Sequence, residues 1–357
     1  MLKQVQHDKR GICDFPPHQG GGFALVLPLD PVDLRRTDSL GGTETRVASS
    51  PCTARASPHL AESVEKVIRS VASPADLLSP LRFALVDRVR GLFNDRSRGE
   101  RPVERSADAL FAPGSMVWRV HGDVTTMMVG GVAALLLQML HPAALAGVID
   151  FSNFRADMLG RLRRTARFVA LTTYGERTAA EAAIERVRSI HAQVEGILPD
   201  GTPYQASDPH LLAWVHVAEA VSFLDAWIRF AEPNMSRADQ DLYFAEFAII
   251  PRALGASPVP ETRAAAEALI SRMRPELRVT RETREVAGLL LSQRLGGPAA
   301  APLEAALAQS AVDLLPRWAS RMLELDRSRF SRPLVHAATL GAAATLRWAF
   351  DTGPARG

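Results

Sequence analysis

Helical periodicity runs from about residue 61 to the end of the chain, where apolar positions recur at spacings of three and four between prolines and glycines. No segment keeps the strict alternation of apolar and polar residues that is typical of strands. The pattern therefore predicts an all-α domain over residues 61–350. Helices are expected at 75–93, 125–147, 157–174, 178–197, 209–230, 237–250, 261–273, 281–290, 302–326 and 334–350.

Residues 1–60 carry Pro, Gly, Ser and Thr without a sustained period, so we expect a disordered N-terminal extension there. Their one apolar piece, 23–29, is only seven residues long and is interrupted by Pro28. Such a piece is a poor secretion signal, and we expect a cytoplasmic protein.

Charge and cysteine content narrow the function classes. The formal net charge of +3 comes from well-mixed Arg, Asp and Glu without a basic block, so nucleic acid is not an expected partner. Cys13 and Cys52 are the only cysteines, and both lie in the N-terminal extension. Neither a disulfide framework nor a thiolate metal site is expected, and any metal must use His or carboxylate ligands.

The stretch 124–149 contains no Asp, Glu, Lys or Arg over 26 residues, which is long enough to span a bilayer. Three features interrupt it: the Gly130-Gly131 pair, Gln138, and the His141-Pro142 pair. An apolar piece of about a dozen residues is typical of a buried core helix, so we favour burial over membrane contact.

His191 is the most informative histidine. It shares one stripe of the predicted helix 178–197 with four apolar residues, Ile184, Val187, Val194 and Leu198. A buried imidazole needs a partner. That partner is either a backbone carbonyl in a purely structural role or an iron atom bound through a neutral ring nitrogen.

His216 has a similar position on the predicted helix 209–230, where it shares a face with Leu212, Ala220, Phe223 and Trp227. Two inward-facing histidines on neighbouring helices favour a cofactor site. The chain has no Glu-x-x-His pair of the kind used by di-iron bundles and no His-Glu-x-x-His zinc motif.

Arg161 and Thr165 lie one turn apart on the predicted helix 157–174. A guanidinium beside a hydroxyl can hold a haem propionate or orient dioxygen in a pocket. The neighbouring Arg163, Arg164 and Arg167 are expected only to solvate the helix.

An ordered set of short motifs resembles the catalytic domain of the MpaB and rubber oxygenase family. The set comprises Phe-Ala-Pro-Gly-Ser-Met-Val-Trp-Arg-Val (111–120), Gly-Gly with Leu-Leu-Leu-Gln-Met-Leu-His-Pro (130–142), Arg-Leu-Arg-Arg-Thr-Ala-Arg-Phe (161–168), Tyr-Gly (174–175), Ile-His-Ala-Gln-Val-Glu-Gly (190–196) and Asp-Pro with Trp-Val-His-Val (208–217). The resemblance covers about residues 107–330.

The resemblance implies a globin-like multi-helix bundle that encloses a haem b pocket, with His191 as the iron ligand and with Arg161 and Thr165 on the distal side. His216 is expected to help bind the cofactor. A lysine that caps the iron in rubber oxygenases is replaced here by Arg164, which cannot act as a ligand. The glutamate given a base role in those enzymes has no match in the stretch 141–149.

Two functions follow as hypotheses. The first is a haem-dependent oxygenase that uses dioxygen to cleave or oxygenate a carbon-carbon double bond of a small apolar, isoprenoid-like substrate. The second is a non-enzymatic helical protein that binds haem or a lipid, in which the histidines are structural. A Soret band and turnover of an alkene separate the two hypotheses.

Overall fold

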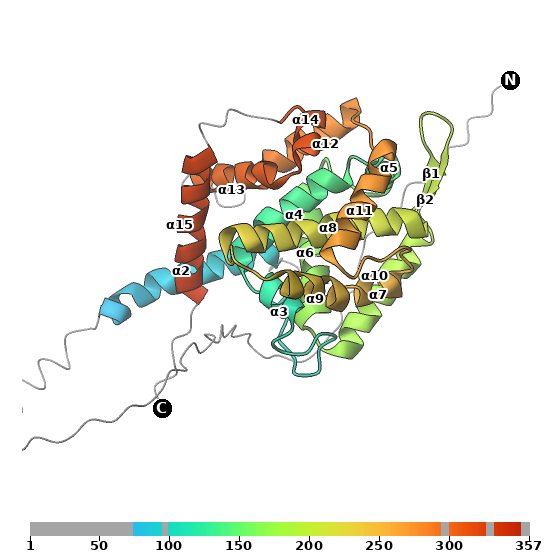
Figure 1. Ribbon diagram of the computed structural model, residues 1–357. Helices are drawn as coiled ribbons and strands as arrows, with labels where there is room; N and C mark the ends of the chain where they lie inside the picture. The colour runs from blue at the N-terminus through green and yellow to red at the C-terminus, as the bar shows by residue number, and fades with distance from the viewer. Residues whose placement is uncertain (1–73, 95–98, 294–299, 326–331, 351–357) are drawn as a thin grey trace, which may run out of the picture.

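A computed structural model describes residues 74–94, 99–293, 300–325 and 332–350 of the chain. The expectations for residues 1–60 lie outside this described part. Within it the chain is almost wholly helical, which confirms the all-α prediction. The elements are α2 (Pro74–Phe93), α3 (Met116–His121), α4 (Val124–Gln138), α5 (Pro142–Phe151), α6 (Met158–Tyr174), α7 (Arg177–His191), β1 (Glu195–Ile197), β2 (Pro203–Gln205), α8 (Pro209–Phe230), α9 (Arg237–Phe247), α10 (Ile249–Leu254), α11 (Arg263–Met273), the 3₁₀ turn η2 (Arg274–Glu276), α12 (Arg281–Leu291), α13 (Ala301–Leu314), α14 (Arg317–Met322) and α15 (Arg332–Phe350) (Figure 1).

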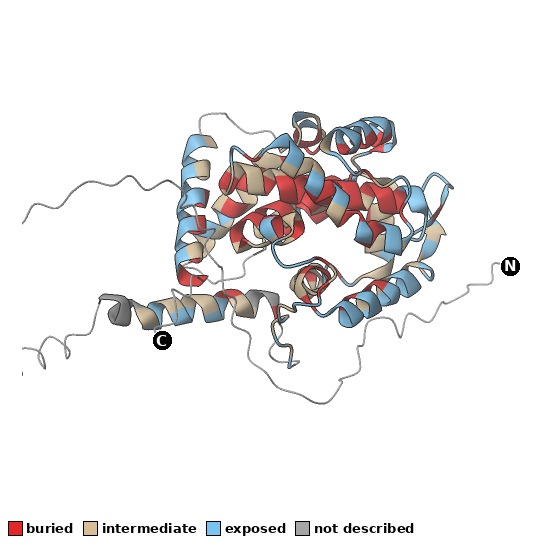
Figure 2. Ribbon diagram, turned by 60° about the horizontal axis from the view of Figure 1, so that its bottom comes forward, coloured by how far each residue is buried: buried red, intermediate tan, exposed pale blue. Residues whose placement is uncertain are grey.

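The core of the protein is built around α4 and α8, which lie side by side through the middle of the molecule (Figure 1). Gly130 makes their close approach possible, because a Cβ atom there would come within 2.9 Å of the Ser222 carbonyl oxygen. Buried residues concentrate on these two helices, while α2, α7, α12 and α15 keep one face exposed (Figure 2).

Side-chain caps explain why several helices begin where the sequence predicts. Asp157 accepts a hydrogen bond from the Gly160 amide at 2.8 Å and starts α6. Asp208 accepts from the Leu211 amide at 2.9 Å, and Pro209 follows in the first turn of α8. The predicted helices 157–174 and 209–230 are confirmed.

The single helix predicted at 125–147 is wrong. The chain forms α4 and α5 instead, which are bent by 104° at the residues between them. Pro142 lacks a backbone N–H, and its ring would clash with the carbonyl of Gln138 if the helix continued. His141 takes an extended conformation and becomes the N-cap of α5.

The predicted helix 178–197 is also wrong in its last part, because α7 ends at His191. The chain then enters a short antiparallel hairpin in which Gly196 pairs with Tyr204. The phenol covers Gly196 so closely that a Cβ atom there would lie 2.7 Å from a ring carbon. The helical stripe therefore stops at His191 and does not extend to Val194 and Leu198.

Two other predicted helices are interrupted. The helix expected at 237–250 ends at Phe247, and α10 begins separately at Ile249. The helix expected at 302–326 divides into α13 and α14 at Pro316, which cannot continue a helix. The short helix α3 was not predicted, because six residues are too few for a periodic pattern.

The apolar helices also meet the length and composition of membrane spans. This holds for α8 alone and for α4 and α5 taken as one bent pair. In α8, 72% of the apolar window is buried inside the protein, so burial in the core accounts for its composition.

Candidate functional site

The four predicted site residues lie on three consecutive helices. Arg161 and Thr165 belong to α6, His191 is the last residue of α7, and His216 lies in α8. The helices α6 and α7 pack together and are joined by Gly175 and Glu176 alone. At 1.5 Å per residue, Arg161 and His191 each lie about 20 Å along their helices from that shared connection.

Thr165 is exposed, and its hydroxyl donates a hydrogen bond to the main-chain carbonyl of Arg161 at 3.2 Å. This contact confirms that the two residues occupy the same face of α6. The hydroxyl proton is used in this backbone hydrogen bond, so the side chain must rotate before it can donate to a ligand.

The prediction that the other arginines of α6 only solvate the helix is wrong. Arg163 donates to the Gly91 carbonyl at 2.9 Å, and Arg167 donates to the Arg101 carbonyl at 2.7 Å. Arg164 forms an ion pair with Asp157 at 3.4 Å. These contacts hold α6 against α2, against the segment before α3 and against its own N-cap. The guanidinium suits this role because it carries five N–H donors.

His191 is partly buried, and its Nδ1 atom is enclosed by protein without a hydrogen-bond partner. Burial lowers the pKa of the imidazole below its usual 6.5, which favours the neutral ring that metal coordination requires. The described residues contain no group of three or more His, Cys, Asp or Glu side chains placed to hold a metal ion. A haem needs only one such side chain, and an unpartnered neutral imidazole fits that requirement.

His216 is buried in an aromatic cluster, with its ring centroid 5.0 Å from that of Phe247. Its Nε2 atom is also enclosed without a partner. Burial lowers the pKa of His216 to about 3, so the ring is neutral at physiological pH. No interaction within the described residues joins His216 to His191.

A buried chain of polar side chains centres on His121, which sequence reasoning did not identify. Its Nδ1 lies 2.9 Å from the Thr173 hydroxyl and its Nε2 lies 3.1 Å from the Tyr243 hydroxyl. The chain connects α3, α6 and α9. Its members are 52 and 122 residues apart in sequence, so no local pattern could have revealed it.

Glu219 is the second polar group that sequence reasoning missed. It lies on α8 among buried neighbours and keeps partial exposure, and no hydrogen bond or ion pair holds its carboxyl within the described residues. Burial raises the pKa of Glu219 to about 7. By contrast, Asp225 on the same helix is paired with Arg263. A perturbed, unpartnered carboxyl in the core is a candidate for chemistry.

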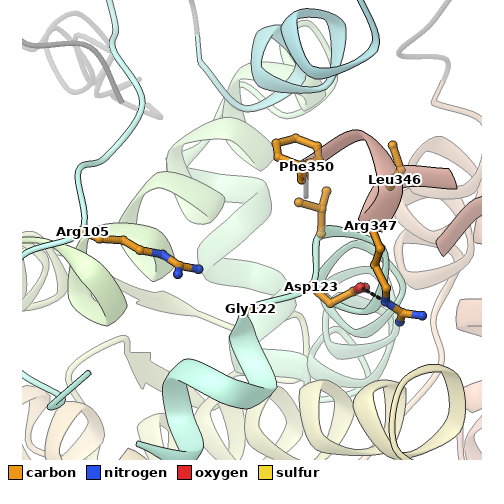
Figure 3. A pocket seen from close by; sticks show the side chains of 7 residues that line it. Arg105, Gly122, Asp123, Leu346, Arg347 and Phe350 are labelled. Atoms are coloured by element: carbon orange, nitrogen blue, oxygen red, sulfur yellow. Dashed lines mark hydrogen bonds and ion pairs between the residues drawn. The ribbon is translucent and has the colours of Figure 1, made fainter. Parts of the chain in front are cut away.

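A pocket lies beside α15 and the connection from α3 to α4 (Figure 3). Arg105 extends toward it from one side, and the Asp123–Arg347 ion pair lies on the other, with Val124, Leu346 and Phe350 supplying apolar surface. None of the four predicted site residues lines this pocket.

Comparison with known proteins gives one finding. Residues 118–348 match a family model described as "ER-bound oxygenase mpaB/B'/Rubber oxygenase, catalytic domain". No curated protein and no solved structure matches the chain. The matched range is more than half of the sequence and contains Arg161, Thr165, His191 and His216.

Proposed function

The chain belongs to the family of mpaB and rubber oxygenase catalytic domains, and from this membership we propose that it is a haem-dependent oxygenase acting on an apolar, isoprenoid-like substrate. The observation that carries the haem assignment is the imidazole of His191, which is neutral and has an enclosed nitrogen without a partner. Leaving a buried polar atom unpaired costs free energy, so a bound group would be stabilised there, and His216 has an unpartnered nitrogen of the same kind.

His191 would hold the haem iron from the end of α7. Haem b, when bound, supplies the activation of dioxygen that no side chain can provide. Leu162 and Phe168 of α6, which are partly buried against the core, would bind the hydrocarbon part of the substrate and exclude water.

Arg161 and Thr165 of α6 would supply the hydrogen-bond donors of the proposed site. A guanidinium that donates to an oxygen atom away from water stabilises developing negative charge. Thr165, which is exposed in the structure, would add a second donor where bound haem and substrate cover it. Arg161 would alternatively anchor a haem propionate, since a bidentate pair with a carboxylate is the strongest contact that it can make.

The proposed partners are dioxygen and one small apolar alkene, and the proposed location is the cytoplasm. One dioxygen molecule added across one carbon-carbon double bond yields two carbonyl groups when the bond is cleaved. Cleavage of the double bond by dioxygen therefore needs no added reductant.

Haem loading and dioxygen uptake test the proposal together. The purified chain is titrated with haem b, and we expect a Soret band with one haem per chain. Squalene, an isoprenoid hydrocarbon, is then added while dissolved dioxygen and carbonyl products are measured. A Soret band without dioxygen uptake for any isoprenoid alkene would favour the non-enzymatic haem-binding protein. Absence of stoichiometric haem binding would contradict the proposal.

A further inference from the structure

Tyr243 and His121 form the most completely described polar contact in the core. Tyr243 is fully buried and His121 is 5% exposed. The phenol oxygen lies 3.1 Å from Nε2 of the imidazole, and Nδ1 of the same ring contacts the Thr173 hydroxyl at 2.9 Å. Burial lowers the pKa of His121 to about 3, which leaves the ring neutral with one N–H and one bare nitrogen.

The direction of the two hydrogen bonds follows from acidity. A neutral imidazole accepts one hydrogen bond and donates one, so only one of the two hydroxyls can donate to it. A phenol is a much stronger acid than an aliphatic alcohol, and Tyr243 is therefore the donor. Its O–H points at Nε2 of His121, and the Nδ1–H of His121 donates to Thr173.

The three tyrosines of the chain differ in what their hydroxyls contact. Tyr174 reaches the Trp118 carbonyl at 3.5 Å, and Tyr204 donates to the Asp150 carboxylate at 2.7 Å. Only Tyr243 bonds to a neutral imidazole. Tyr204, whose hydroxyl contacts a carboxylate, is thus a natural control for Tyr243.

Aromatic rings surround the Tyr243–His121 pair and exclude water. The His121 ring packs edge-on against Phe223 and Phe247, with ring centroids 5.1 Å away in both cases. Burial, and after it the charge of Glu219, raises the pKa of the Tyr243 phenol. His216, which is neutral, packs against the same Phe247 ring.

We propose that Tyr243 and His121 form a redox-active pair. A one-electron oxidant derived from dioxygen or peroxide takes one electron from the phenol, the phenolic O–H bond breaks, and the proton forms an N–H bond on Nε2 of His121. The products are a neutral tyrosyl radical, an imidazolium and the oxidant reduced by one electron. Return of one electron and of the same proton restores the pair.

Two aromatic side chains on the same helices offer a path by which an electron can leave the pair. Trp118 lies one turn before His121 on α3, and Tyr174 follows Thr173 on α6. The rings of Trp118 and Tyr174 lie 5.1 Å apart between centroids, and Trp118 is partly exposed. These rings are the proposed route to an external oxidant, so the test needs no haem.

Flash photolysis of the full-length chain with a ruthenium tris-bipyridine complex and a sacrificial acceptor tests the proposal. We expect a tyrosyl radical by electron paramagnetic resonance, with an oxidation rate about twofold or more slower in deuterated water. With ¹⁵N-labelled histidine, double-resonance spectra of the unaltered protein should show coupling of the radical to an imidazole nitrogen. This second measurement needs no substitution.

Substitutions test whether the radical lies on Tyr243 and whether its proton moves to His121. Tyr243→Phe should lose the signal, whereas Tyr204→Phe should keep it. His121→Gln should lose the solvent isotope effect. A signal that persists in Tyr243→Phe, or a radical in the unaltered protein without imidazole coupling, would overturn the proposal. Both results are independent of whether the chain is an oxygenase.

Discussion

The carboxylate of Asp123 and the guanidinium of Arg347 lie 2.6 Å apart, although 224 residues separate them in sequence. The same carboxylate caps α4 by accepting from the Thr126 amide at 2.8 Å. Arg347 also donates to the Phe230 carbonyl at 3.0 Å. These two contacts of Arg347 therefore fix the C-terminal helix α15 to both central helices, α4 and α8.

Arg347→Ala should destabilise the protein by about 2–3 kcal/mol, because it leaves the Asp123 carboxylate, which is 8% exposed, without its counter-charge. Arg155→Ala is the control. Its partner Glu285 is well exposed, so the loss should stay within about 1 kcal/mol. Urea denaturation measures both. Equal losses in the two variants would show that the Asp123–Arg347 pair contributes no more than a surface contact.

The neighbouring glycines of α4 should respond to alanine in opposite ways. A Cβ atom at Gly130 would meet the backbone of α8 at 2.9–3.0 Å, so Gly130→Ala should destabilise by about 1–3 kcal/mol or more. At Gly131 the nearest atom is a Phe223 ring carbon at 3.8 Å. Gly131→Ala should be neutral or stabilise by up to about 1 kcal/mol, because alanine favours helix. Thermal unfolding of the two variants checks the difference in sign.

His216 should make the protein sensitive to acid. Burial lowers its pKa to about 3 in the folded chain, against 6.5 in the unfolded chain. Below pH 6.5 the unfolded state gains a proton that the folded state does not, so the free energy of unfolding decreases as pH falls toward 3, by roughly 1 kcal/mol per pH unit. His216→Phe should remove this contribution. Parallel stability curves for the two proteins between pH 7 and pH 4.5 would contradict the burial argument.

Arg161 and Thr165 should matter for turnover more than for haem content. Removing one donor that faces developing charge in a dry pocket typically lowers turnover about 10²- to 10³-fold. We expect Arg161→Ala and Thr165→Ala to keep haem and lose most dioxygen uptake. Arg188→Ala, an exposed change on α7, should leave both unchanged. Loss of haem from Arg161→Ala would make Arg161 a propionate anchor, and unchanged haem and uptake in both variants would remove the pair from the site.

Local signals in the sequence are sufficient for much of this fold. The start of α8 follows from Asp208 and Pro209, since a cap and a first-turn proline act within four residues. The end of α7 at His191 is different. It depends on Tyr204 closing over Gly196 from the second strand, a tertiary contact that periodicity does not contain.

The candidate site also contains residues with a local sequence signal and residues without one. Arg161 and His191 stand out because each has a helical pattern around it or belongs to a short motif. His121, Tyr243 and Glu219 have no such signal. Their properties arise from burial and from partners on other helices, and only the packed structure brings those together.

Haem retention by His191→Ala tests the central claim most directly. The variant and the unaltered chain are loaded with haem b, passed through a desalting column, and compared by Soret absorbance and by circular dichroism. His210→Ala, a change at an exposed histidine of α8, is the matched control. We predict that His191→Ala keeps its helicity, loses its haem and regains a Soret band when free imidazole is added, while His210→Ala retains its haem. Full Soret absorbance in a well-folded His191→Ala protein would contradict the account.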